Sequence, residues 1–192
     1  MNIVFMGTPE FAVPSLRAIL NTAHNIQAVV TVPDKPKGRG LKLSESAVKL
    51  CALQKNLKIL QPEKLKDPQF ISTLKELKPD LIVIVAFRIL TPEVFKLPDF
   101  GSVNLHASLL PKYRGAAPIN WAIIRGEKQS GVTTFFLKEK VDTGNIIMQE
   151  AVQINDEDNA GTLHDKLKVT GAETLIKTID AGLTIPWAFK RI

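Results

Sequence analysis

An almost wholly apolar run, DLIVIVA at residues 80–86, constrains the fold of this chain more than any other feature. A strand with so few polar residues is typical of a parallel sheet that helices cover on both faces. Two further apolar runs, at residues 2–6 and 26–32, flank a segment with helical spacing at residues 10–20. A strand–helix–strand unit of this length favours parallel strands joined by a right-handed crossover. The sequence therefore predicts an α/β fold with an open, doubly wound, mostly parallel sheet.

The same alternation of strands and helices continues along the chain until its character changes near residue 130. Two later segments alternate more between apolar and polar residues, which predicts an antiparallel pair at one edge of the sheet. A long amphipathic segment then closes the fold. The expected elements are a helix at 44–54 capped by Ser44, a strand at 57–60, a helix at 67–78 with Asp67 as N-cap and Pro68 at its first position, strands at 101–107, 131–139 and 145–154, and helices at 116–126 and 160–182.

Length, charge and cysteine content narrow the class of protein. A chain of 192 residues is long enough for one well-packed domain. No apolar run approaches the roughly 20 residues that a membrane span needs, and the single cysteine, Cys51, excludes an internal disulfide framework. We therefore expect a cytoplasmic protein with Cys51 as a buried thiol in a helix. The net charge of +6 favours contact with polyanions such as nucleic acid.

Two polar residues stand near the end of the strand predicted at 101–107. Alternate residues of a strand face the same side, so Asn104 and His106 share one face. Val103 and Leu105 share the other face and can pack into the sheet. Because open α/β sheets bind ligands at the carboxyl ends of their strands, an amide that stabilises an oxyanion and an imidazole that moves protons suit acyl-type transfer here. The same two residues are also compatible with a hydrogen-bonded core pair that has no catalytic task.

Two later segments complete a candidate site. A Leu-Leu-Pro turn at residues 109–111 makes an apolar lip beside the polar pair, which fits a flat, partly aromatic ligand or an ordinary loop. An Asp-Thr-Gly turn at residues 142–144 is common in hairpins for backbone reasons alone. Next to His106, however, the Asp142 carboxylate would fix the tautomer of the ring and support its protonated form.

Four segments together resemble one protein family. They are GTPEFA at 7–12, PDKPKGRG at 33–40, NLHASLLPKYRGAAPINWAI at 104–123 and VDTGNII at 141–147. In this order, over essentially the whole chain, they are similar to the methionyl-tRNA formyltransferases. The block Asn-x-His-x-Ser-Leu-Leu-Pro followed by Asp-x-Gly is shared by the wider 10-formyltetrahydrofolate transferases, which include the glycinamide ribonucleotide and sugar N-formyltransferases. The segment GTPEFA and the continuation SLLPKYRGAAPI are shared most closely with the tRNA and sugar branches.

The resemblance implies a fold, a reaction and a set of site residues. The fold would be the Rossmann-like formyltransferase fold. The reaction would transfer a formyl group from 10-formyltetrahydrofolate to the α-amino group of initiator methionyl-tRNA through a tetrahedral intermediate. Asn104 and His106 would hold the oxyanion, and His106, oriented by Asp142 directly or through water, would assist proton transfer. The residues expected to bind the folate co-substrate are Ser108, Leu109, Leu110 and Pro111, together with Phe87 and Arg88, which border the expected pterin pocket.

A basic segment distinguishes the branches of this family. Two glycines make it pliable enough to order on an RNA backbone. The resemblance implies that it engages the acceptor end of tRNA, whereas a charged, glycine-rich segment taken alone is usually a solvated surface loop. Its cations, which oppose only Asp34, are Lys35, Lys37, Arg39 and Lys42.

The resemblance implies no metal, and the histidines agree with that expectation. They are scattered along the chain and have no ligand spacing with Cys51. We interpret His24 and His164 as surface or helix residues.

The resemblance also implies a division of the chain. Residues 1–183 would form the formyltransferase catalytic domain, and residues 184–192 would begin a linker. The methionyl-tRNA formyltransferases carry a second, carboxyl-terminal β-barrel domain that helps bind tRNA, and we expect it to be absent here. No membrane contact and no obligate protein partner are implied. The alternatives are a sugar-nucleotide N-formyltransferase that uses the same folate, and a non-catalytic folate- or RNA-binding module.

Overall fold

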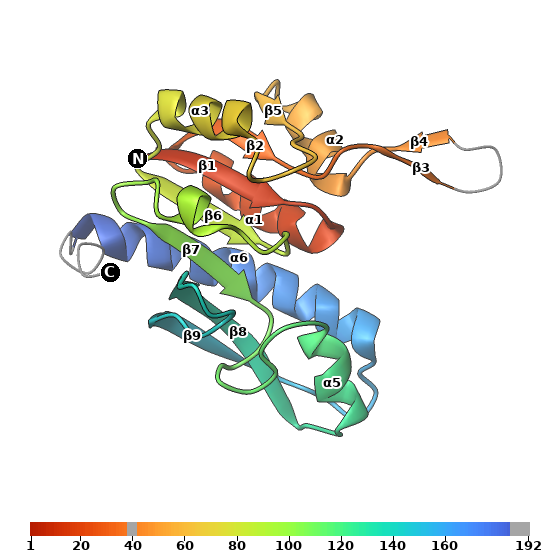
Figure 1. The fold of residues 1–192 in the computed structure, drawn as a ribbon. Coiled ribbons are helices and arrows are strands. Elements are labelled where there is room, and N and C mark those ends of the chain that lie inside the picture. Colours follow the sequence, from red (N-terminus) through yellow and green to blue (C-terminus); the bar gives the residue numbers. More distant parts are fainter. Residues whose placement is uncertain (38–41, 185–192) are drawn as a thin grey trace.

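The computed structural model describes residues 1–37 and 42–184, whose centre is a seven-stranded sheet (Figure 1). Its strands are β1 (Asn2–Gly7), β2 (Asn25–Val30), β5 (Ile59–Leu60), β6 (Leu81–Val85), β7 (Ser102–His106), β8 (Gln129–Phe136) and β9 (Ile146–Gln153). They lie in the order β5-β2-β1-β6-β7-β8-β9. Neighbours from β5 to β7 pair in parallel, and β7–β8 and β8–β9 pair antiparallel. This arrangement confirms the predicted open, mostly parallel sheet with an antiparallel edge.

Helices cover both faces of the sheet. They are η1 (Glu10–Ala12), α1 (Val13–Leu20), α2 (Ala47–Gln54), α3 (Pro68–Leu77), α4 (Pro92–Phe95), α5 (Pro118–Ile124) and α6 (Ala160–Thr184). The N-cap of α3 is the predicted one, because the Asp67 carboxylate accepts the N–H of Gln69 at 2.8 Å. The short helix α4 has no counterpart among the predicted elements, since four residues are too few to show a helical period.

The alternation of side chains along the central strands builds two apolar clusters. On β1, Ile3 and Phe5 belong to the cluster covered by α1, α2 and α6. Val4 and Met6 belong to the opposite cluster, which is covered by α3 and α4. Every residue of β6 is buried, which explains the unbroken apolar run in the sequence. Cys51, on α2, is 3% exposed, as predicted for a structural thiol.

A two-stranded hairpin of β3 (Lys35–Lys37) and β4 (Lys42–Ser44) extends away from the body of the molecule (Figure 1). The sequence predicts a pliable loop there because of its two glycines. The two strands were not expected, since the short basic run has no strand-like alternation. Ser44 pairs with Lys35 in this hairpin. The prediction that Ser44 caps α2 is therefore wrong. Ser46 is the cap, and its hydroxyl accepts the N–H of Lys49 at 3.0 Å.

Some of the residues predicted to bind tRNA lie outside the described part of the chain. Arg39 is not described, and only the backbone of Lys37 and Lys42 is described. Residues 185–192, assigned to a linker, are also outside it. Among the described helices, none combines the length and the apolar character needed to cross a membrane.

Candidate active site

A cavity of about 600 Å³ opens at the carboxyl ends of the central strands. Its walls come from the turn after β1, the loop after β6, the end of β7, the segment that enters α5, the β8–β9 turn and the start of α6. This is the edge at which open α/β sheets bind ligands, and its volume is in the range of about 300–1,000 Å³ common for small-molecule sites.

Asn104 and His106 both line this cavity from β7. The faces of the strand divide as predicted, because Val103 and Leu105 are buried in the apolar cluster on the other side. Asn104 lies between Ile84 of β6 and Phe135 of β8 in the strand register. The pairing of β7 with β6 on one side and β8 on the other therefore holds the amide and the imidazole at the cavity wall.

The hydrogen bond of the His106 ring defines its neutral tautomer. Its Nε2 lies 2.8 Å from the carbonyl oxygen of Tyr113. Because a carbonyl only accepts, Nε2 carries the hydrogen and Nδ1 of the neutral ring is left without one. Nδ1 faces Asp142, and 3.8 Å separates it from Oδ2. That separation is too long for a direct hydrogen bond, but a carboxylate so close stabilises the ring once Nδ1 takes up a proton.

The β8–β9 turn holds Asp142 in a left-handed backbone conformation, with φ at 49°. Its Oδ2 accepts the N–H of Gly115 at 2.8 Å, and its carbonyl accepts the Nε–H of Arg114 at 2.9 Å. The segment before α5 and the turn that carries Asp142 are thus tied together. The close approach of the turn to β8 requires Gly144, since a Cβ there would lie 1.5 Å from the carbonyl oxygen of Phe136.

Tyr113 presents its carbonyl to His106 from a strained backbone position, with φ at 56°. Its hydroxyl donates to Oε1 of Glu127 at 2.6 Å, and Lys112 also contacts that carboxylate. These hydrogen bonds lower the pKa of Glu127 and raise the pKa of the Tyr113 phenol. The loop that fixes the tautomer of His106 is therefore anchored at its far end.

The segment from Ser108 to Pro111 lies behind the cavity rather than in its wall. The Ser108 hydroxyl donates to the carbonyl of Lys112 at 2.7 Å, and Leu110 is buried. The Leu110–Pro111 peptide bond is cis. A role of this segment in holding folate stays a prediction. The contacts present here show it shaping the loop that follows His106.

Two residues that the sequence analysis missed support this segment from the antiparallel strands. Thr133, on β8, is fully buried and lies opposite His106 in the strand register. Its hydroxyl donates to the carbonyl of Ser108 at 2.7 Å and accepts the N–H of Leu110 at 3.1 Å. The Nε2 of Gln149, on β9, donates to the same hydroxyl and to the carbonyl of Leu110, both at 2.9 Å. Only the pairing of distant strands brings these groups together, so no local pattern reveals them.

Phe87 and Arg88 lie in the loop after β6 and line the cavity. The Arg88 guanidinium donates to the carbonyls of Pro62 and Glu63 at 2.8 and 2.9 Å and lies 5.2 Å from the centre of the Phe87 ring. Burial lowers the pKa of Arg88. The loop before it is strained, because Ala86 has φ at 47°. Arg88 thus joins two loops at the carboxyl edge of the sheet, and its predicted contact with a co-substrate stays a prediction.

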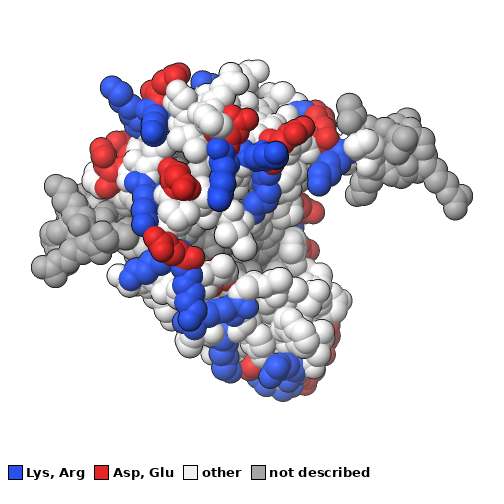
Figure 2. All heavy atoms as spheres, viewed as in Figure 1, with Lys and Arg blue, Asp and Glu red and all other residues white. Residues whose placement is uncertain are grey.

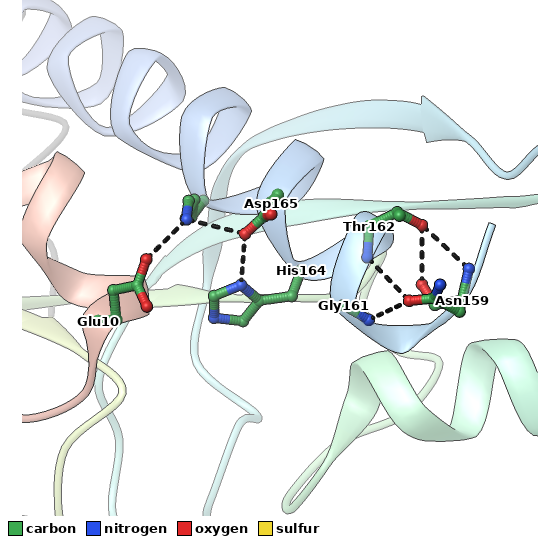
Figure 3. A network of polar contacts seen from close by, with 7 residues as sticks. Glu10, Asn159, Gly161, Thr162, His164 and Asp165 are labelled. Carbon is green, nitrogen blue, oxygen red and sulfur yellow. Dashed lines mark hydrogen bonds and ion pairs between the residues drawn. The ribbon is translucent and has the colours of Figure 1, made fainter.

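His164 lies in helix α6, as the sequence suggested, and it also lines the cavity. Its ring meets the edge of Phe11, with 5.4 Å between the ring centres. Figure 3 shows the polar side of this contact, where Nδ1 of His164 lies 3.1 Å from Asp165. Lys168 links Asp165 to Glu10 through contacts of 2.8 and 2.9 Å and lowers the pKa of Asp165. The start of α6 is thereby clamped to η1 at one wall of the cavity.

The basic hairpin is anchored at its base. Asp34 forms an ion pair with Lys49 of α2 and accepts Nε2 of Gln61 at 2.9 Å. The hydrogen bond from Lys49 is the main cause of the lowered pKa of Asp34. Lys35 is exposed. Elsewhere, Figure 2 shows basic and acidic side chains interspersed over the visible face of the body, so the run of cations at the hairpin is a local feature.

Within residues 1–37 and 42–184, no group of three or more His, Cys, Asp or Glu side chains is placed to hold a metal ion.

Relatives resemble this chain over most of its length. The family model described as formyl transferase matches residues 1–179. The methionyl-tRNA formyltransferase of Thermodesulfovibrio yellowstonii is 56% identical over 179 residues, which cover 93% of this chain and 58% of that protein. The methionyl-tRNA formyltransferase of Caldanaerobacter subterraneus is 55% identical over 191 residues, which cover 97% of this chain and 62% of that protein. The chain thus spans about three fifths of the length of these relatives.

A solved structure shares the fold. The crystal structure of phosphoribosylglycinamide formyltransferase from Bacillus halodurans superposes with a TM-score of 0.78 at 23% identity, covering 97% of both chains. At this identity the likeness concerns the fold alone.

Proposed function

This chain belongs to the formyl transferase family, and on that premise we propose that it transfers a formyl group from 10-formyltetrahydrofolate to the α-amino group of initiator methionyl-tRNA in the cytoplasm. The observation that carries the proposal is the meeting of Asn104, His106 and Asp142 at one cavity. The identity of more than 50% to methionyl-tRNA formyltransferases supports tRNA as the acceptor.

The cavity suits a folate donor in size and lining. Apolar side chains of Ile84, Phe87 and Leu90 form one wall, against which a flat heteroaromatic ring can pack. The polar groups of β7 lie at the adjoining wall. The donor supplies the formyl carbon, and the protein supplies the hydrogen bonds and the proton acceptor around it.

The proposed mechanism assigns one task to each polar residue. The Asn104 amide donates a hydrogen bond to the formyl oxygen as negative charge develops on it. The Nδ1 of His106, unprotonated in the neutral ring, accepts the proton that the attacking amine loses. Asp142 stabilises the resulting imidazolium from 3.8 Å. Nδ1 then donates this proton to the folate nitrogen as the bond between that nitrogen and the formyl carbon breaks and tetrahydrofolate leaves. The Tyr113 carbonyl holds the ring in place throughout.

The test is formyl transfer by the 192-residue chain to methionyl-tRNA, beside an amino-sugar nucleotide as the second acceptor. We expect transfer to the tRNA, with turnover lowered by roughly 10²- to 10⁴-fold in His106→Ala and by about 10²- to 10³-fold in Asn104→Ala. His24→Ala, which lies outside the cavity, is the matched histidine control. Transfer to the amino-sugar nucleotide alone would show that the sugar, and not tRNA, is the acceptor. If both site variants were about as active as the parent chain, the proposal would be overturned.

A further inference from the structure

Helix α5 carries an exposed stripe that the proposed chemistry does not use. Trp121 is 47% exposed and Ile124 is 70% exposed. The Arg125 guanidinium lies 5.9 Å from the centre of the Trp121 ring. Since residues three and four apart share one side of a helix, these three side chains form one surface, here called the α5 stripe.

The α5 stripe begins at the mouth of the cavity. Ala117, one helical turn before Trp121, lines the cavity, and its carbonyl accepts the N–H of Trp121 at 3.2 Å. Pro118 and Asn120 line the cavity as well. The α5 stripe therefore begins beside the cavity that Asn104 and His106 line, and it continues along the helix away from that cavity.

Exposed cations border the α5 stripe. Exposed cations stand before and after the helix, and the acidic Glu127 among them is already bonded to Tyr113 and Lys112. In Figure 2 the area around α5 is largely uncharged, with both basic and acidic side chains at its lower edge. The exposed cations are Lys112, Arg114, Arg125 and Lys128.

An exposed aromatic ring with an arginine beside it and further cations around it is a combination that binds single-stranded nucleic acid. The ring stacks on an unpaired base, and the cations neutralise neighbouring phosphates. Of these cations, Lys112 pairs with Glu127 and Lys128 pairs with Asp156. The positive charge that an occupant of the α5 stripe must match is therefore that of Arg114 and Arg125, and phosphates match it where an apolar protein surface would not. The charge therefore favours RNA as the occupant.

We propose that Trp121 and Arg125 form a stacking platform for an unpaired base at the acceptor end of the RNA, beside the cavity that receives its amino group. This proposal rests on the proposed function, since it specifies where the same substrate is held. The cavity of about 600 Å³ would hold the folate ring and the aminoacyl group that accepts the formyl. The nucleotides that carry that group must consequently lie outside it, along a surface such as the α5 stripe.

The first experiment measures stacking without any formyl donor. The chain has two tryptophans, Trp121 and Trp187, so the Trp187→Phe variant leaves Trp121 as the only indole emitter. Titration with a short single-stranded RNA should quench its fluorescence saturably. In the same variant, the fluorescence of a 2-aminopurine base placed in the RNA should also be quenched when that base stacks on Trp121. Absence of both signals at saturating RNA would overturn the platform.

The second experiment compares matched variants for affinity toward methionyl-tRNA. Trp121→Leu keeps an apolar side chain but removes the π-face, and we expect the Kd to rise about ten-fold. Trp121→Phe keeps a smaller aromatic face and should lose less. Thermal melts of both variants check that the fold is retained. If both variants bound methionyl-tRNA with the same Kd as the parent chain, stacking on Trp121 would be contradicted.

The outcomes separate this proposal from the function on which it rests. Formyl transfer to methionyl-tRNA with unchanged affinity in Trp121→Leu would overturn the platform alone. Quenching by RNA without any formyl transfer would support the platform and overturn the proposed reaction. Quenching that follows protein concentration without RNA, together with a dimer in sedimentation, would assign the α5 stripe to a second copy of the chain and overturn the RNA platform.

Discussion

At the scale of single residues, the candidate site depends on polar groups that are buried behind it. The Thr133 hydroxyl joins Ser108, Leu110 and Gln149, and none of these side chains reaches into the cavity. These side chains support the loop that follows His106. The carbonyl of Tyr113 in that loop sets the tautomer of the His106 ring. The role proposed for His106 thus depends on buried residues that hold its loop in place and do not contact the substrate in the proposed mechanism.

Thr133→Val tests this dependence, because valine keeps the shape and removes the hydroxyl. The buried N–H of Leu110 and the carbonyl of Ser108 would then lose a partner, which should lower the free energy of unfolding by about 1–3 kcal/mol. Turnover should fall as well, since the loop behind His106 loosens. Urea unfolding and the formyl-transfer assay measure the two effects. Thr133→Ser restores the hydroxyl and should recover most of both, whereas a valine variant as stable as the parent would rule the network out.

At the scale of elements, the start of α6 is held by two side chains. Asn159 accepts the N–H groups of Gly161 and Thr162 at 2.8 and 3.1 Å, as an N-cap residue does (Figure 3). Asp158, just before it, bonds to Lys166, to the N–H of Asn155 and to the Thr162 hydroxyl, and these contacts lower the pKa of its carboxyl to about 2. The capped end then presents His164 to the cavity.

The lowered pKa of Asp158 predicts a dependence of stability on pH. A carboxyl with a lower pKa in the folded chain stabilises the fold above its ordinary pKa of 3.8, and this contribution is lost as the pH falls toward 2. Asp158→Asn should therefore be less stable than the parent chain at about pH 6 and should lose less stability between about pH 4 and about pH 2. Urea unfolding across this range is the measurement. Asp156→Asn, in an exposed pair with Lys128, is the control and should change little because solvent screens it.

The β8–β9 turn is the second element on which the site depends. In Gly144→Ala the added methyl group would meet the Phe136 carbonyl, so the turn must open and carry Asp142 away from His106. We expect a loss of about 1–3 kcal/mol in the free energy of unfolding and a fall in turnover. Thr143→Ala removes one exposed hydrogen bond from the same turn and should have a much smaller effect on both. Equal effects of the two variants would argue against close packing as the reason for the glycine.

At the scale of the whole molecule, the sheet places its two polyanion-binding candidates on different elements. The β3–β4 hairpin extends from the body (Figure 1), and the Asp34–Lys49 ion pair fixes its base to α2. The α5 stripe lies beside the cavity on the antiparallel side of the sheet.

Joint replacement of Lys35, Lys37 and Arg39 by alanine tests the hairpin. Each lost phosphate contact should reduce the slope of log K against log salt by about 0.7–0.9, so the three together should reduce it by up to roughly 2–3. Binding of methionyl-tRNA at several salt concentrations is the measurement. The control replaces Lys75, Lys78 and Lys96, which surround a groove at the other end of the strands. If both triple variants reduced the slope equally, the effect would come from net charge and not from the hairpin.

Much of this architecture could be predicted because its causes are local. The apolar run at residues 80–86 predicted a strand covered on both faces, and β6 is fully buried. The alternation around Asn104 and His106 predicted that they share a face of β7, and both line the cavity. Side-chain periodicity and capping depend on neighbours within a few residues, so the sequence states them directly.

The sequence by itself determined the succession of strands and helices apart from α4 and the β3–β4 hairpin, the two faces of the central strands and the polar residues at the end of β7. Only the tertiary structure decided that Thr133 supports the loop behind His106, that Tyr113 sets the tautomer of that ring, and that His164 belongs to the cavity. It also moved the cap of α2 from Ser44 to Ser46, because pairing in the hairpin takes up Ser44. Each of these contacts joins groups whose distance is set by strand pairing or loop closure rather than by the repeat of one element, and a pattern along the chain does not encode that distance.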